Sequence, residues 1–274
     1  MKTKAFVTGW PISHSKSPAL HSYWLEQYGI EGSYEPIAVE EGNFEEFLAA
    51  LKSNGFVGGN VTIPHKETAF RLIGNLDAAA RAIGAVNTLW FEDDHLHGSN
   101  TDAYGFMANL DDYHSQWRDG EKALVIGAGG ASRAVVYALI EAGFSQINIA
   151  NRTYERAENL ANDFGNSCFS KKLDEIEKLL PDMDFVVNTT SLGMVGQGSG
   201  NLPDLSGLSD TAVVTDIVYT PLMTPFLATA QARGLKAIDG LGMLLHQAVP
   251  GFEKWFGKRP EVTPDLRRHV LDIK

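Results

Sequence analysis

The feature of this sequence that most constrains its fold is a glycine-rich turn, Gly127-Ala-Gly-Gly-Ala-Ser132, set between two regular segments. The apolar run Lys122–Ile126 before the turn predicts a buried strand, and residues 132–142 after it have helical spacing. A second apolar run, Gln146–Ala150, predicts another strand. This order is typical of a βαβ unit, whose two strands pair in parallel and whose helix covers one face of the sheet.

The turn also indicates what such a unit binds. Gly127 permits a tight turn, Gly129 lets a ligand approach the backbone, and the helix N-terminus offers N–H groups and a positive dipole end to phosphate. Ser132 replaces the usual third glycine and is small enough for the helix. We therefore predict a dinucleotide-binding Rossmann domain and a nicotinamide cofactor, with a ligand-free glycine turn as the alternative. The predicted cofactor contacts in the turn are Gly127, Ala128, Gly129, Gly130 and Ala131.

The end of the second strand bears on the choice of cofactor, because it reads Asn151-Arg152-Thr153. NAD sites usually carry a carboxylate here for the ribose hydroxyls, and a carboxylate would repel a 2′-phosphate. Arg152 can instead bind that phosphate through two hydrogen bonds. We therefore predict NADP(H), with a solvated surface arginine as the alternative for Arg152. The candidate contacts here are Asn151, Arg152, Thr153 and Arg156.

Composition limits the remaining function classes. The chain has 274 residues, enough for two domains, and 44% of them are hydrophobic. Its single cysteine, Cys168, excludes a disulfide framework and a cysteine-based metal site, and it fits a reducing compartment. The formal net charge of −11 disfavours nucleic-acid binding. Neither a signal peptide nor an apolar run of about 18 residues is present, so we expect a cytoplasmic protein with no membrane partner. We also expect a monomer or homodimer.

The first hundred residues alternate short strands with helices, which predicts an α/β fold with a mostly parallel sheet. Ser17-Pro18 predicts the start of a helix, with Ser17 as its N-cap and proline at the first helical position. Residues 85–91 and 95–98 predict a hairpin. A second unit begins near Tyr104. Its further predicted strands are residues 184–189, 212–218 and 236–238. Its glycine-rich loop 195–201 is expected to move with cofactor exchange. Residues 242–274 are expected to be mainly helical.

In about the first hundred residues, polar residues cluster at positions where the predicted strands and helices do not require them. Ser15 and Ser17 stand at a strand-to-helix junction, and Asn60 and Thr62 share one side of an extended segment. The later members are Lys66, Asn87 and the segment Asn100-Thr-Asp102. Taken singly, each has a structural explanation as a helix cap, a turn residue or a surface lysine.

Taken together, these clusters resemble the motifs of one family. The chain carries in order Ser15-Lys-Ser-Pro18, Asn60-Val-Thr-Ile-Pro-His-Lys66, Gly84-Ala-Val-Asn-Thr88, Asn100-Thr-Asp102, the glycine turn, Asn151-Arg152-Thr153 and Asn188-Thr-Thr-Ser-Leu-Gly-Met194. With this series it resembles the shikimate dehydrogenase (shikimate/quinate dehydrogenase) family over nearly its whole length. The resemblance implies an NADPH-dependent, reversible reduction of 3-dehydroshikimate to shikimate, a step toward the aromatic amino acids.

The resemblance also implies the domains and the role of each site residue. Residues 1–102 with 241–274 would form the substrate-binding and catalytic domain, residues 103–240 the NADP-binding Rossmann domain, and the substrate would lie in a cleft between them. Lys66 and Asp102 would be the catalytic pair. Ser15 and Ser17 would bind the substrate carboxylate, and the other substrate-binding residues would be Asn60, Thr62, Asn87, Asp102, Tyr219 and Gln247. The nicotinamide side would be bordered by Thr190, Met194, Ile217, Val218, Gly240 and Met243.

The chemistry of the reaction fits these roles. Hydride addition to a ketone leaves an alkoxide, which needs a proton from a positioned donor such as Lys66. Three alternatives remain open: a quinate or quinate/shikimate dehydrogenase that uses NAD, another Rossmann reductase such as a folate or glutamyl-tRNA reductase, and a non-catalytic NADPH-binding regulatory module. Arg152 argues against the first, the complete set of substrate motifs against the second, and the retained Lys66 and Asp102 against the third.

Overall fold

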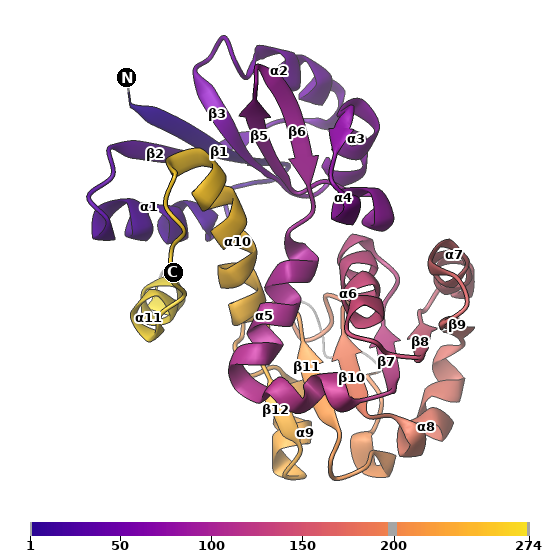
Figure 1. Cartoon of the computed structure of the whole chain (residues 1–274). Helices are drawn as coiled ribbons and strands as arrows, with labels where there is room; N and C mark the ends of the chain where they lie inside the picture. Colours follow the sequence, from indigo (N-terminus) through magenta and orange to yellow (C-terminus); the bar gives the residue numbers. More distant parts are fainter. Residues whose placement is uncertain (1, 197–201, 273–274) are drawn as a thin grey trace. The chain divides into compact units, whose positions relative to one another are not determined.

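The computed structural model describes residues 2–196 and 202–272 (Figure 1). Part of the predicted loop 195–201 therefore lies outside the described residues. The chain forms two compact units, the first made of Met1–Asp102 and Leu245–Lys274 and the second of Ala103–Leu244. The second unit includes residues 241–244, which the sequence assigns to the first. Gly242 explains this, because it packs so closely on Asn109 of the second unit that a Cβ there would overlap the Asn109 side chain.

The first unit holds a six-stranded sheet in the order β2-β1-β3-β5-β6-β4. Pairs β1–β2, β1–β3 and β4–β6 are parallel, whereas β3–β5 and β5–β6 are antiparallel, so the sheet is mostly parallel as predicted. Its strands are β1 Thr3–Gly9, β2 Gly32–Ala38, β3 Phe56–Val61, β4 Asn75–Leu76, β5 Thr88–Glu92 and β6 His95–Ser99. Its helices are α1 Ser17–Gln27, α2 Phe44–Ala50, α3 Lys66–Leu72, α4 Ala78–Ile83 and α11 Pro264–Asp272, with the end of α10 Leu241–Phe256 and a short 3-10 turn at Glu41–Asn43.

Helices cover both faces of this sheet, because β1 alternates its apolar side chains between two cores. Phe6 packs in a cluster with Phe44 of α2, whereas Ala5 and Val7 pack with Trp255 of α10. The predicted hairpin is confirmed as β5–β6, with Asp93 and Asp94 in the left-handed conformation at its turn. No helix in the described part of the chain is long and apolar enough to cross a membrane.

The start of α1 corrects one prediction. The helix begins at Ser17, so its N-cap is Lys16 and Pro18 is the second helical residue. Ser17 already has a helical backbone, and its N–H, the first of the helix, donates to the Ser15 hydroxyl at 3.3 Å; the N-cap Lys16 makes no side-chain capping hydrogen bond. Proline remains compatible with the first turn because no intrahelical hydrogen bond is needed there.

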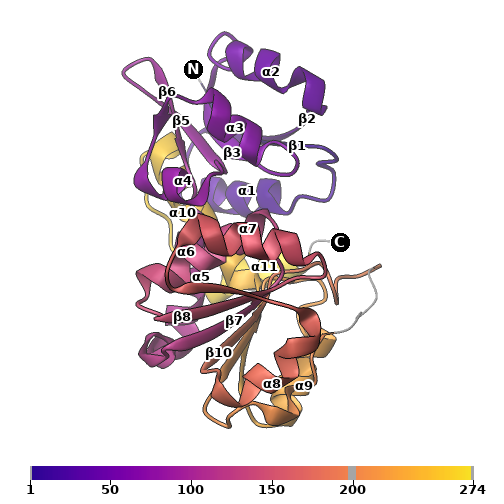
Figure 2. The same cartoon turned by 90° about the vertical axis from the view of Figure 1, so that its right-hand side faces the viewer.

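The second unit is a Rossmann fold. Its six strands all pair in parallel in the order β12-β11-β10-β7-β8-β9, which is the doubly wound order 6-5-4-1-2-3. Figure 2 shows α6 and α7 on one face of this sheet and α8 and α9 on the other. The strands are β7 Lys122–Ile126, β8 Gln146–Ala150, β9 Cys168–Lys171, β10 Phe185–Asn188, β11 Val213–Asp216 and β12 Lys236–Ile238. The helices are α5 Asp102–His114, α6 Gly130–Glu141, α7 Tyr154–Phe164, α8 Ile176–Leu179, α9 Pro225–Ala232 and the start of α10, with 3-10 turns at Ser115–Asp119, Leu173–Glu175, Leu180–Asp182 and Leu205–Gly207.

The strand order fixes where a ligand binds in this unit. The order reverses between β7 and β10, and ligands of such sheets bind outside the carboxyl ends of the strands at that point. The glycine turn follows β7, and the segment from Thr189 onward follows β10. The two loops therefore meet at the predicted cofactor position.

Candidate active site

The first unit brings Lys66 and Asp102 together. Lys66 is the first residue of α3 and Asp102 the first of α5, and the Lys66 Nζ donates to Asp102 Oδ2 at 2.6 Å. The Asp102 side chain is 11% exposed and that of Lys66 23% exposed. A pair this well shielded interacts more strongly than one in open water, yet the ammonium still has N–H donors left for a ligand.

Asn87 holds the other oxygen of Asp102. Its Nδ2 donates to Asp102 Oδ1 at 2.8 Å and lies 3.4 Å from Oε1 of Gln247, a residue of α10. The Oδ1 of Asn87 accepts the backbone N–H of Thr101 at 2.9 Å and the hydroxyl of Thr88 at 2.8 Å. These donors fix the amide so that its N–H groups face the carboxylate. The structure thus gathers four predicted residues, Lys66, Asn87, Asp102 and Gln247.

Asn60 lies behind this cluster and is 5% exposed. Its Oδ1 accepts the Tyr34 hydroxyl at 2.5 Å, and its Nδ2 donates to the Asn87 carbonyl at 3.0 Å and to Thr88 Oγ1 at 3.1 Å. Burial raises the pKa of Tyr34 well above its usual value, with a smaller opposing effect from the Ser17 hydroxyl. The phenol therefore stays protonated and remains a donor, and Asn60 supports Asn87 from its backbone side.

Ser17 and Thr62 complete the predicted polar set of the first unit. Ser17 is buried at the start of α1, and Ser15 beside it is half-buried. Thr62 is half-buried in the turn before α3, where its backbone N–H donates to Thr8 and its carbonyl accepts from His65. Gly9 approaches this turn so closely that a Cβ would lie 2.5 Å from Thr62 Cγ2. These contacts set the backbone that precedes Lys66.

The glycine turn of the second unit fits a dinucleotide. Gly127 has φ +118°, and a Cβ there would lie 2.5 Å from Thr189 Oγ1, so only glycine is accommodated. Ser132 Oγ accepts the Gly129 N–H at 2.9 Å and lies 2.7 Å from Thr189 Oγ1, which ties the turn to the loop after β10. Among the described residues, none meets a Cβ built on Gly129 or Gly130 within 4 Å. The N-terminus of α6 is therefore open to a pyrophosphate.

The segment after β8 presents basic side chains to solvent. Arg152, Thr153 and Arg156 are exposed, and the Asn151 Nδ2 donates to the Thr153 carbonyl at 2.9 Å, which shapes the turn. Within the described residues neither Arg152 nor Arg156 forms an ion pair with a carboxylate. An arginine without an anionic partner can accept a phosphate at little desolvation cost.

The segments after β10, β11 and β12 carry the residues predicted for the nicotinamide side. The Ile217 N–H donates to the Asn188 carbonyl at 3.0 Å, which joins the loop after β11 to the end of β10. Gly240 approaches so closely that a Cβ would lie 2.5 Å from the Ile217 carbonyl. Burial raises the pKa of Tyr219. Of the other residues predicted for the nicotinamide side, Thr190 and Met243 are half-buried, Val218 is buried and Met194 is exposed.

Several contributing residues were not singled out from the sequence. Tyr34 joins the site only through Asn60, which lies 26 residues away in the chain. Thr88 was quoted only as the end of a motif, although its hydroxyl donates to the adjacent Asn87 at 2.8 Å. Asp216 did carry a signal, since a carboxylate that ends an otherwise apolar strand is unusual.

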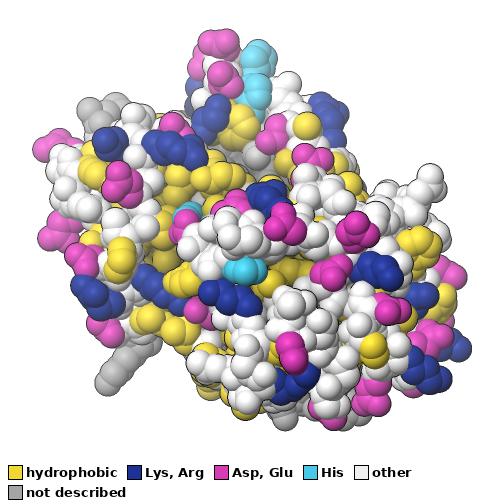
Figure 3. Space-filling view, turned by 60° about the horizontal axis from the view of Figure 1, so that its bottom comes forward, with side chains coloured by type: hydrophobic (Ala, Val, Ile, Leu, Met, Phe, Trp, Pro, Cys, Tyr) yellow, Lys and Arg dark blue, Asp and Glu magenta, His cyan; other side chains and the backbone are white. Residues whose placement is uncertain are grey.

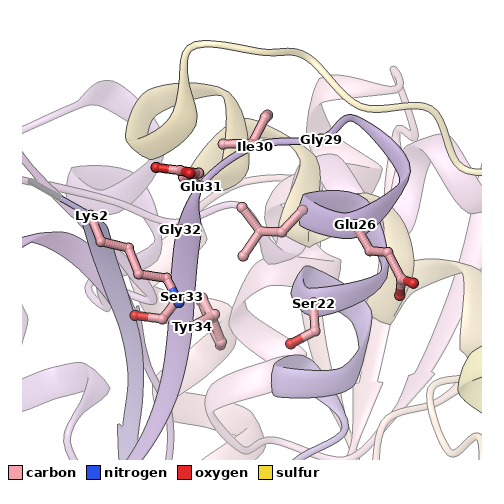
Figure 4. A pocket seen from close by; sticks show the side chains of 10 residues that line it. Lys2, Ser22, Glu26, Gly29, Ile30, Glu31, Gly32, Ser33 and Tyr34 are labelled. Atoms are coloured by element: carbon pink, nitrogen blue, oxygen red, sulfur yellow. The ribbon is translucent and has the colours of Figure 1, made fainter.

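The surface shows mixed charge and a cavity. Acidic and basic side chains are interspersed over the face shown in Figure 3. A cavity of about 510 Å³ opens between α1 and β2, and its lining includes Ser22, Glu26 and Tyr34 (Figure 4). None of its lining residues is a predicted site residue.

Comparison with known proteins places the chain among related sequences. Three family models match it: the shikimate dehydrogenase substrate binding domain over residues 7–89, shikimate/quinate 5-dehydrogenase over residues 113–207, and the shikimate 5′-dehydrogenase C-terminal domain over residues 240–267. A shikimate dehydrogenase (NADP(+)) from Brucella abortus is 57% identical over 98% of this chain and 93% of its own.

Solved structures give the same result. The shikimate 5-dehydrogenase from Thermus thermophilus, in complex with NADP(H) and shikimate, aligns with a TM-score of 0.86 and 36% identity over 98% of each chain. A quinate dehydrogenase from Corynebacterium glutamicum, in complex with NAD, aligns with a TM-score of 0.91 and 29% identity over 99% of each chain.

Proposed function

The chain belongs to the shikimate dehydrogenase family, and from this premise we propose how its own residues carry out the reaction. It is an NADP-dependent oxidoreductase that reversibly reduces 3-dehydroshikimate to shikimate. The observation that carries the proposed mechanism is the shielded Lys66–Asp102 pair at 2.6 Å.

Lys66 is the general acid of the proposed mechanism. NADPH, when bound, supplies the hydride that reduces the ketone carbon. Lys66 donates a proton from Nζ to the carbonyl oxygen, which becomes the new hydroxyl group, and takes that proton back in the oxidation direction. Asp102 accepts from Nζ and so holds the ammonium in place, while Asn87 occupies the second carboxylate oxygen. The alkoxide therefore never has to exist as a free ion.

The remaining polar residues of the first unit are proposed to bind substrate. Ser15 and Ser17, at the start of α1, offer hydroxyls and a helix N-terminus to the substrate carboxylate. Thr62, Asn87, Asp102 and Gln247 are proposed to bind the ring hydroxyls. Tyr219, in the loop after β11, is proposed as a further substrate-binding residue. Asn60 acts in this proposal by supporting Asn87, because both N–H groups and the oxygen of its amide already have partners.

The second unit is proposed to bind the cofactor through the glycine turn at the pyrophosphate and through Arg152 and Arg156 at the 2′-phosphate. The open N-terminus of α6 and the exposed arginines support this assignment. A NAD-dependent quinate dehydrogenase is the second candidate, because such an enzyme shares the fold. Arg152, and the absence of a carboxylate from the sequence Asn151-Arg152-Thr153 after β8, favour NADP and shikimate.

We further propose that the enzyme acts in the cytoplasm as a monomer or homodimer and does not bind nucleic acid. The single cysteine fits a reducing compartment such as the cytoplasm, and the net charge of −11 disfavours binding to nucleic acid.

Replacement of Lys66 by alanine tests the mechanism. Lys66→Ala should lower kcat by roughly 10²–10⁴-fold in both directions, the usual contribution of a general acid or base. Lys52→Ala is the matched control, because Lys52 also pairs with a carboxylate, Asp94, at 2.8 Å but is 58% exposed. A Lys66→Ala enzyme with near-normal kcat and only a raised KM for substrate would make Lys66 a binding residue instead.

A further inference from the structure

Asp216 is a buried carboxylate that the mechanism above does not use. It ends β11 and has an exposed fraction of 0%. Its Oδ1 accepts from Asn188 Nδ2 and from the Val218 N–H, both at 3.0 Å, and its Oδ2 accepts the Thr224 hydroxyl at 2.7 Å. All three partners are uncharged, and burial raises the pKa of Asp216 despite them. A group this costly to bury needs a compensating role.

The contacts of Asn188 show what Asp216 holds on one side. Asn188 Oδ1 accepts the backbone N–H of Thr190 at 3.0 Å and its hydroxyl at 2.7 Å, and Asn188 Nδ2 also donates to the Leu192 carbonyl at 3.2 Å. The Asn188 amide therefore shapes the loop after β10, and Asp216 fixes which way that amide points.

Two other segments converge on the same carboxylate. Val218 belongs to the loop after β11, so its N–H brings that loop onto Asp216. Thr224 is the N-cap of α9, where its Oγ1 accepts the Leu227 N–H at 3.3 Å while it donates to Asp216. One side chain thus fastens the loop after β10, the loop after β11 and the start of α9.

The donors explain why the position requires an acceptor. The Val218 N–H can only donate, and Asn188 must present Nδ2 because its Oδ1 already accepts from Thr190. We propose that Asp216 is a positioning residue for the nicotinamide half of the cofactor, holding the two loops that carry Thr190, Met194, Ile217 and Val218. This inference rests on the proposed function, which assigns those four residues to the nicotinamide side.

Two substitutions distinguish the hydrogen bonds that Asp216 accepts from its negative charge. In Asp216→Asn the amide oxygen keeps the two donors of Oδ1, and the new NH₂ group faces the Thr224 hydroxyl, which can accept it. In Asp216→Ala all three donors lose their acceptor. We expect Asp216→Ala to raise the Kd and KM for NADPH by about 10- to 100-fold, as expected for misplaced binding loops, and Asp216→Asn to stay within about threefold of wild type.

Adenosine 2′,5′-bisphosphate is the control ligand, because it reports only on the adenosine end of the site. Its Kd should be unchanged in Asp216→Ala. An equal loss of affinity for this ligand and for NADPH would overturn the proposal in favour of a general folding role, and so would an unchanged Kd for NADPH. Since both Kd values are measured without turnover, absence of activity in the wild type would refute the proposed function and leave this test intact.

Discussion

His21 gives a quantitative prediction about acid stability. The ring lies on α1 with an exposed fraction of 0%, stacked on Tyr34 with centroids 3.9 Å apart and facing Phe252 at 5.8 Å. Within the described residues neither ring nitrogen has a hydrogen-bond partner. Burial lowers the pKa of His21 from 6.5 to about 3, with a smaller opposing effect from the nearby Asn60 side chain. The folded protein keeps this imidazole neutral at pH values where the unfolded chain protonates it.

The sign and size of the effect follow from that difference. The unfolded chain binds a proton at His21 that the folded protein does not bind. The contribution of the neutral His21 ring to the free energy of unfolding is therefore fully present above pH 6.5 and is lost as the pH falls toward about 3. One pKa unit corresponds to roughly 1.4 kcal/mol, so lowering the pH from about 7 to about 5 removes about 2 kcal/mol through this group alone. His21→Phe keeps an aromatic ring in the stack and abolishes the proton uptake.

Urea unfolding, followed by circular dichroism at pH 7 and pH 5, measures the difference. Between pH 7 and pH 5, the free energy of unfolding of the wild type should fall by about 2 kcal/mol more than that of His21→Phe. His14→Gln is the matched control, because it removes a solvent-exposed histidine and leaves the stacked His21 ring in place. If the free energies of unfolding of wild type and His21→Phe fell by the same amount between pH 7 and pH 5, the reasoning would be refuted.

Three further predictions concern other parts of the molecule. Arg152→Ala should raise the KM for NADPH by roughly 10- to 100-fold through loss of charge-assisted hydrogen bonds, and leave the KM for NADH unchanged; an equal effect on both cofactors in steady-state kinetics would contradict the 2′-phosphate assignment. Asn87→Ala should lower kcat by at least about tenfold, because Asp102 loses the donor on Oδ1; kinetics that match wild type would remove Asn87 from the site. Burial raises the pKa of the Cys168 thiol, so a thiol reagent should modify it far more slowly in native protein than in urea, and equal rates would show that the thiol is accessible.

The strands of the second unit could largely be predicted from the sequence. The runs Lys122–Ile126, Gln146–Ala150 and Lys236–Ile238 coincide with β7, β8 and β12, because each is an apolar stretch bounded by turn residues. The strand β9 was missed. It lies at the sheet edge, where only Cys168 of its four residues is buried, so it carries no apolar run.

The candidate site was predictable only in part, for a similar physical reason. Motif order indicated Lys66, Asn87 and Asp102, and the structure brings them together. Periodicity along a chain does not report contacts across it, so the support of Asn60 by Tyr34, 26 residues away, became visible only in the fold. The N-cap prediction for Ser17 was wrong for a local reason, since the helix already begins at Ser17 and the Ser17 N–H donates to the neighbouring Ser15 hydroxyl.

The most direct test of the account is the absorbance of NADPH in a mixture of wild-type protein, NADPH and 3-dehydroshikimate. We predict rapid loss of the NADPH signal with wild type and with the Lys52→Ala control, and a rate lower by roughly 10²–10⁴-fold with Lys66→Ala. Wild-type protein that is folded by circular dichroism and leaves NADPH unconsumed would contradict the proposed function. Equal rates in wild type and Lys66→Ala would contradict the assignment of Lys66 as the proton donor.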